Sequence, residues 1–144
     1  MQLILDTNEY IFAFGYIKES SPHPSKRLIP LILELFPLYE LRISRLIVEE
    51  VRPHLALEDF AKFIRFVNDL TIIDEDILVP FELGAKYEAK GLKSSDALIA
   101  AYCEWTGADI LVTENRHFLR RQPDIPFKVL SSEKCLKLIK TSPR

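Results

Sequence analysis

Apolar residues recur along the chain in two patterns, as short uninterrupted runs and as longer stretches with helical spacing. Short apolar runs are typical of buried strands, and they occupy residues 2–5, 40–43, 71–73, 109–113 and 127–130. The longer stretches favour helices over residues 7–18, 26–36, 44–52, 58–70, 80–90, 96–106 and 132–139. Short strands that alternate with helices of about ten residues predict a three-layer α/β/α domain around a mostly parallel sheet of four or five strands.

Polar residues, glycines and prolines mark several boundaries of these elements. Ser44 and Ser95 are the expected N-caps of the helices that follow them, because a serine hydroxyl can accept from a free N–H of the first turn. Gly91 and Gly107 are expected to end two helices. Residues 114–126 carry no predicted helix or strand until the last apolar run begins.

The composition is that of a folded protein without a membrane segment. Of the 144 residues, 48% are hydrophobic and 28% are charged, so enough apolar side chains exist to offset the entropy lost on ordering the chain. We expect a single domain over residues 1–144. The longest uncharged apolar run, residues 10–17, is far shorter than the ~20 residues that cross a bilayer. No signal peptide is visible, and two cysteines are too few for a disulfide framework, so we expect a cytoplasmic protein.

Acidic residues follow or flank the predicted strands near the end where α/β sheets bind ligands. Asp6 comes directly after the first apolar run, and Asp96 lies in the first turn of an apolar helix. Glu50 flanks the apolar stripe of its helix, whereas Glu49 points further away. Each acid alone also has a simpler interpretation. Asp6 can be a helix N-cap, Asp96 a first-turn acid that is stabilised by the helix dipole, and Glu50 a solvated residue at the edge of its helix.

Together, Asp6, Glu50 and Asp96 favour a metal site. They come from separated segments that this layout brings to one sheet edge, where unpaired carboxylates repel one another. A hard divalent cation such as Mg²⁺ or Mn²⁺ prefers carboxylate and water oxygens and removes that conflict. Such a site can activate a water beside a phosphodiester bond and stabilise the leaving oxyanion.

Four strings of the sequence, in this order, resemble the PIN domain family: LILDTN (residues 3–8), SRLIVEEV (44–51), DALIAA (96–101) and GADILVT (107–113). The resemblance covers essentially the whole chain and implies a parallel sheet between helices. It also implies a metal-dependent ribonuclease, as in the toxins of VapBC-type toxin–antitoxin pairs. In that pattern the catalytic, metal-binding acids correspond to Asp6, Glu50 and Asp96.

The resemblance also implies supporting residues, and the sequence departs from the family pattern at one of its positions. Thr7 or Asn8 supports the first acid, and Thr113 lies beside a fourth metal position. Many relatives carry an acid two residues after this threonine, where this chain has Asn115. Asparagine offers a neutral oxygen without a carboxylate's charge, so we expect one firmly held metal. The two nearest acids are the alternatives for this position. One is Glu114, which is otherwise expected to be a supporting residue, and the other is Asp109.

Basic residues cluster directly after the predicted site strand: Arg116, His117, Arg120 and Arg121. We interpret them as an RNA-binding rim that contacts phosphates beside an acidic pocket, and the alternative is a solvated, salt-bridged loop. The formal net charge of −2 excludes a globally basic nucleic-acid binder but leaves room for such a rim. His117 is expected to form a structural hydrogen bond, and His23 and His54 are expected at the surface.

The leading hypothesis is a Mg²⁺- or Mn²⁺-dependent endoribonuclease acting on single-stranded or loop RNA. If it is a toxin, a small antitoxin protein is its expected partner, and the resemblance implies a homodimer. The first alternative is a catalytically weak module that binds RNA or a protein, motivated by Asn115. A second alternative is a phosphotransferase with Asp6 as nucleophile. That reading is disfavoured, because Asn8 stands where such enzymes usually carry an acid, and no glycine-rich phosphate loop exists.

Overall fold

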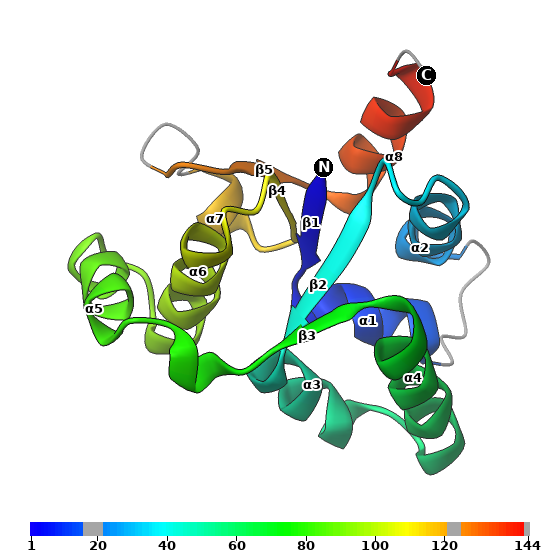
Figure 1. Cartoon of the computed structure of the whole chain (residues 1–144), viewed down its shortest axis with the longest axis horizontal. Helices are drawn as coiled ribbons and strands as arrows, with labels where there is room; N and C mark the ends of the chain where they lie inside the picture. Colours follow the sequence, from blue (N-terminus) through cyan, green and yellow to red (C-terminus); the bar gives the residue numbers. More distant parts are fainter. Residues whose placement is uncertain (16–21, 121–124, 143–144) are drawn as a thin grey trace.

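The protein is built around one parallel sheet, shown in Figure 1. The computed structural model describes residues 1–15, 22–120 and 125–142. All neighbouring strands in the described part are parallel. Their order across the sheet is β3 (Ile72–Asp74), β2 (Glu40–Ser44), β1 (Gln2–Leu5), β4 (Ile110–Val112) and β5 (Lys128–Leu130). The predicted α/β class with a parallel sheet is therefore confirmed, with five strands.

Helices cover both faces of this sheet (Figure 1). One face carries α1 (Thr7–Phe14), α2 (Ser25–Glu34), α4 (Leu57–Leu70) and α8 (Ser132–Thr141), in which α1 contacts α2 and α4, and α8 contacts α2. The other face carries α5 (Phe81–Ala89) and α6 (Ser94–Thr106), which pack against each other. The shorter elements are α3 (Arg45–Val51), η1 (Arg52–His54), η2 (Asp76–Leu78) and α7 (Arg116–Leu119). No helix in the described ranges is both long enough and apolar enough to cross a membrane.

The central strand β1 shows why the sheet forms. Leu3, Ile4 and Leu5 are all fully buried, as expected of a strand that is covered by helices on both faces and has neighbours on both edges. Its register pairs Leu5 with Val112 of β4. An uninterrupted apolar run therefore becomes the middle of the core.

The strand order creates a switch point between β1 and β4. The chain leaves β1 toward β2 and β3, crosses to the opposite face through α5 and α6, and returns on the other side of β1 as β4 and β5. In sheets of this kind, the crevice beyond the carboxyl ends at the switch point is where ligands bind. Asp6 lies at this point, where its N–H donates to the carbonyl of Val112 at 2.8 Å.

Most predicted boundaries agree with the structure, and one predicted cap is wrong. The Ser44 hydroxyl accepts from the N–H of Ile47 at 3.3 Å and caps α3 as predicted. Gly107 ends α6 at φ +68°, a conformation that strains any other L residue. Ser95, however, is not the cap of α6. The helix begins at Ser94, and Lys93 precedes it without a side-chain cap.

Two further differences concern the end of α1 and the presence of α7. α1 ends at Phe14, before Gly15, and the end of the predicted helix, residues 16–18, lies outside the described residues. Helix α7 was not predicted at all. It has four residues and begins where Asn115 Oδ1 accepts from the N–H of His117 at 2.9 Å. One helical turn is too short to produce an apolar periodicity, so only the cap could have indicated it.

Candidate functional site

The three predicted acids line one cleft of about 550 Å³ at the switch point. Asp6 reaches it from the end of β1, Glu50 from α3 and Asp96 from the first turn of α6. The predicted supporting residues Thr7 and Asn8 line the cleft as well. Its remaining walls come from Phe12, Pro53, His54, Ser95, Ile99, Glu114 and Asn115. Segments far apart in the sequence thus bring their acids to one place.

Asp6 is the most strongly constrained of these acids. The Thr113 hydroxyl donates to Asp6 Oδ2 at 2.8 Å, and the N–H of Thr7 donates to Oδ1 at 2.8 Å. Burial raises the pKa of the Asp6 carboxyl above its ordinary value. The two hydrogen bonds oppose this rise, and the nearby charge of Asp96 adds to it. Asp6 is therefore both the N-cap of α1, its simpler interpretation, and a fixed wall of the cleft.

Glu50 is held by a hydroxyl from the neighbouring helix. Thr7 Oγ1 donates to Glu50 Oε2 at 3.0 Å. Burial raises the pKa of Glu50, the Thr7 hydroxyl lowers it, and the charges of Asp6 and Asp96 raise it again, so that the net pKa is raised. Glu49 lies on the surface and pairs instead with Arg52 at 3.0 Å. The geometry thus agrees with the helix phase that favoured Glu50 over Glu49.

Asp96 meets Asn115 across the cleft. The Asn115 side-chain amide donates to Asp96 Oδ2 at 3.2 Å, while its oxygen accepts from the N–H of His117. The N–H of Asn115 donates in turn to the Thr113 hydroxyl at 3.0 Å. Asn115 therefore orients Asp96 and begins α7 at the same time. Its amide oxygen keeps one lone pair for a further ligand.

A second network fixes α6, the helix that carries Asp96. The Tyr102 hydroxyl donates to Asp74 Oδ2 at 2.6 Å, and Arg42 donates to both oxygens of Asp74 at 2.6 and 2.9 Å. Although burial raises the pKa of Asp74, the hydrogen bonds from Arg42 and Tyr102 outweigh it and lower that pKa. This network ties α6 to strands β2 and β3 and so holds Asp96 at the cleft.

The alternatives for the fourth position separate clearly. Asp109 lies before β4, at the opposite end of the strand from the cleft, and accepts from the N–H of Gln2 at 2.7 Å. Glu114 lines the cleft, but its Oε2 accepts from the N–H of Ser132 at 3.1 Å. Asn115 is the residue that contacts Asp96 directly. Of the three, Asn115 and Glu114 border the cleft.

The basic residues follow the cleft along α7. Arg116 and His117 lie in α7, Arg120 directly follows it, and all three are exposed. Arg121, the fourth predicted member of the rim, lies outside the described residues. The N–H of His117 donates to Asn115, but the residue is exposed, and no hydrogen bond of its ring occurs among the described residues.

The donor set of the cleft fits a hard divalent cation. Its acids supply oxygen ligands only. Burial, with a smaller contribution from neighbouring acids, raises the pKa of Asp6 and of Glu50, and a cation would relieve both effects. Among the described residues, Asp6, Glu50 and Asp96 do not form a group whose ligand atoms all lie within 4.8 Å of one another. Mg²⁺ tolerates such spacing, because it keeps several waters between itself and protein carboxylates.

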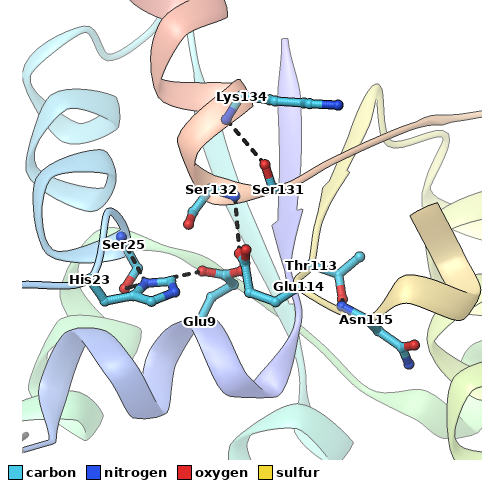
Figure 2. A network of polar contacts seen from close by, with 9 residues as sticks. All are labelled: Glu9, His23, Ser25, Thr113, Glu114, Asn115, Ser131, Ser132 and Lys134. Carbon is cyan, nitrogen blue, oxygen red and sulfur yellow. Dashed lines mark hydrogen bonds and ion pairs between the residues drawn. The ribbon is translucent and has the colours of Figure 1, made fainter.

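Sequence reasoning missed a group beside the cleft, formed by Glu9, His23 and Glu114 (Figure 2). His23, expected at the surface, is only partly exposed: its ring packs against Phe12 with centroids 4.5 Å apart, and 19% of its side chain is exposed. His54 is exposed as predicted, yet it lines the cleft. A signal for Glu9 existed, since it is the single charged residue of α1.

Comparisons with known proteins agree with this geometry. The PIN domain family profile matches residues 3–122, most of the chain. No curated protein matches the sequence. A chain in the crystal structure of VapBC2 from Rickettsia felis, bound to a DNA fragment from their promoter, has a similar fold with a TM-score of 0.61. The two chains are 21% identical over 91% of this chain and 98% of that one, which shows the fold alone. With the family profile matched over most of its length, the chain belongs to the PIN domain family.

Proposed function

We propose that this protein is a divalent-metal-dependent endoribonuclease, folded as one domain over residues 1–144. The observation that carries the proposal is the convergence of Asp6, Glu50 and Asp96 in one cleft at the switch point of the sheet. Membership of the PIN domain family supports the same conclusion, because PIN domains are generally nucleases. None of these acids has a basic side chain as a hydrogen-bond partner among the described residues, which leaves their charge for a cation.

In this proposal, Asp6, Glu50 and Asp96 hold Mg²⁺ or Mn²⁺, and Asn115 offers a neutral oxygen. Such a cation supplies the charge that acidifies a water beside a phosphodiester bond and stabilises the leaving oxyanion. The chain's own contribution is orientation. Thr113 fixes Asp6 through its hydroxyl, and Thr7 fixes Glu50 in the same way, while Asn115 holds Asp96. Ligands held by such outer hydrogen bonds lose less entropy when they bind.

The RNA is expected to approach along α7. Arg116 and Arg120 are exposed beside the acid cleft, and positive charges there attract the phosphates of a single strand. Replacing both by glutamine should make the negative slope of log(kcat/KM) against log(salt) shallower by about 1.4, since each phosphate contact contributes about −0.7. Lys62→Gln, on the exposed face of α4, is the control that should leave the slope unchanged. An unchanged slope in the double variant would mean that Arg116 and Arg120 do not contact the RNA phosphates.

We further propose that the protein is the toxin of a type II toxin–antitoxin pair, with an antitoxin as its protein partner, a homodimer as its assembly and the cytoplasm as its location. The fold shared with a chain of VapBC2 from Rickettsia felis supports this proposal. Expression of the wild type should arrest growth, whereas expression of Asp6→Asn should not. Growth arrest that persists in Asp6→Asn would argue against a toxic nuclease.

The test of the activity is cleavage of a mixed single-stranded RNA by purified protein with Mn²⁺, with Mg²⁺ or with EDTA. We expect cleavage that requires the cation and is lost in Asp6→Asn. The matched pair Glu50→Gln and Glu49→Gln sharpens the test, because these neighbours differ in whether they face the cleft. Glu50→Gln should reduce kcat/KM at least about 100-fold, whereas Glu49→Gln should leave it near the wild-type value. Greater damage from Glu49→Gln would refute the assignment.

One observation favours a second candidate function, a catalytically weak module that binds RNA or a protein. The amide of Asn115 donates to Asp96 and its oxygen caps α7, so this side chain already serves two internal roles. If antitoxin-free, folded wild type cleaves no RNA in Mn²⁺ yet binds it, this second function replaces the first.

A further inference from the structure

A second polar cluster adjoins the acid cleft and serves no step of the proposed reaction (Figure 2). Glu9 comes from α1, His23 from the segment before α2, and Glu114 from the loop after β4. One ligand atom of each lies within 4.8 Å of the others. Glu9 Oε2 and His23 Nδ1 are 4.0 Å apart, too far for a hydrogen bond.

Two polar groups in this cluster are buried without a hydrogen-bond partner. The Glu9 side chain is fully buried, and neither of its carboxyl oxygens has a partner. The hydroxyl of Ser132, which lies beside it, is also buried and unpartnered. Burying such groups costs free energy unless something compensates them, so native proteins rarely keep them unpaired. Figure 2 shows the Glu9 carboxyl directed at the space between His23 and Glu114.

Hydrogen bonds hold the other two members in place. The N–H of Ser25 donates to His23 Nδ1 at 3.2 Å, and the Ser25 hydroxyl lies 2.8 Å from the same nitrogen. In this tautomer Nδ1 accepts from Ser25 with its single lone pair, so a metal ion would have to replace Ser25 as its partner. The His23 ring also packs against Phe12, with the two ring planes inclined by 33°. The N–H of Ser132 holds Glu114 Oε2 at 3.1 Å. Two carboxyl groups and one imidazole nitrogen therefore lie close together around one point.

We propose that Glu9, His23 and Glu114 form a site for a divalent transition-metal cation of borderline softness, represented by Zn²⁺. A nitrogen ligand favours such a cation over Mg²⁺, which takes oxygen ligands. A tetrahedral ion with bonds of about 2.1 Å separates its ligand atoms by roughly 3.4 Å, so the 4.0 Å pair needs to close by about 0.6 Å. The Ser132 hydroxyl or a water completes the coordination. The bound ion would tie α1, the start of α2 and the loop after β4 together.

In the metal-free protein, a proton on Glu9 neutralises the negative charge that a bound cation would otherwise balance. Burial, followed by the influence of Glu114, raises the pKa of Glu9 to about 10. Although burial raises the pKa of Glu114, the neighbouring Glu9 carboxyl and the Ser132 N–H outweigh this effect and lower that pKa. Glu9 is thus a neutral acid in the metal-free protein. Glutamine has the same shape and is also neutral, so Glu9→Gln should fold normally.

The experiment titrates the full-length protein with Zn²⁺ by calorimetry and follows the Tm in parallel. Wild type should bind Zn²⁺ with a rise in Tm of several degrees. Glu9→Gln and His23→Ala should lose this rise and bind Zn²⁺ about tenfold or more weakly. Asp96→Asn, which weakens any Zn²⁺ bound in the acid cleft, should keep the binding event and the rise in Tm that Glu9→Gln loses. His117→Ala, which removes an exposed histidine, should behave like the wild type.

Either of two results would overturn the site. Equal Zn²⁺ stabilisation of wild type and Glu9→Gln would mean that a proton alone joins Glu9 to Glu114. Loss of the zinc effect in Asp96→Asn but not in Glu9→Gln would place the ion in the acid cleft. Neither result affects the nuclease proposal, whose test is RNA cleavage with Mg²⁺ or Mn²⁺.

Discussion

Asn115→Asp tests how the cleft balances its charges. The substitution keeps an oxygen that can accept from the N–H of His117, so α7 keeps its cap. It removes the amide N–H that donates to Asp96 Oδ2 at 3.2 Å and puts a second negative charge there. In the absence of a cation, the change should therefore destabilise the protein.

The magnitude follows from this distance. Two like charges about 4 Å apart at an effective dielectric constant of 20 repel by about 4 kcal/mol. Asp96 and Asn115 are only partly buried, so solvent screening reduces that repulsion to roughly half. Loss of the hydrogen bond to a charged acceptor adds about 1–2 kcal/mol. We expect the free energy of unfolding in EDTA to fall by about 3–4 kcal/mol.

A bound cation should reverse the sign of this effect. With Mn²⁺ in the cleft, the added carboxylate becomes a ligand, so Asn115→Asp should bind Mn²⁺ more tightly and gain more stability from it than wild type. Urea unfolding in EDTA measures the loss of stability without a cation, and urea unfolding in Mn²⁺ measures the stability gained from the cation. The m-value is the check on two-state behaviour. Asn115→Ser is the neutral control, because serine keeps a helix cap but adds no charge. A variant as stable as wild type in EDTA, or one whose deficit Mn²⁺ does not reduce, would refute the reasoning.

Two further predictions concern the hydrogen bonds that support the acids. Thr113→Val removes the buried hydroxyl that holds Asp6, and it should raise the Mn²⁺ concentration for half-maximal cleavage about tenfold or more. Thr113→Ser keeps the hydroxyl and is the control for the loss of the methyl group. An unchanged metal response in the valine variant would contradict the positioning role. Tyr102→Phe removes a 2.6 Å bond to Asp74 and should cost about 1.5–3 kcal/mol at pH 7. Because the pKa of Asp74 is lowered in the folded protein, its contribution to stability is complete above the ordinary value of 3.8 and is lost as the pH falls from there through the lowered pKa. Urea unfolding should show the difference between the variant and wild type shrinking over that range, and a difference that is independent of pH would contradict the prediction.

The sheet and the acid cleft could be predicted because both depend on local patterns. A run such as Leu3–Leu5 can be buried on both faces only in a central strand, and an acid directly after it must lie at the carboxyl end of the sheet. The helix phase then distinguishes Glu50 from Glu49. These arguments use neighbours in sequence and one rule of topology, and no long-range contact has to be known.

The hydroxyls that hold the acids were harder to predict. Thr7 and Thr113 lie 106 positions apart in the sequence, yet they support Glu50 and Asp6 in the same cleft. Nothing in the local sequence shows that a threonine after one strand will donate to an acid after another. The pairing of β1 with β4 brings Thr113 beside Asp6. The family resemblance indicated only that Thr113 lies near the metal site.

Glu9 shows why a buried acid can escape a pattern-based analysis. In sequence it is one charged residue in an apolar helix, which usually indicates an exposed position. Its environment is instead made by residues from distant segments, His23 and Glu114, which converge on it only in the folded chain. Glu114 borders both the acid cleft and this cluster, so a substitution there would disturb two sites at once. Glu9→Gln and Asp96→Asn each change one of them, and only these single-site variants can assign an effect of a metal to the cluster or to the cleft.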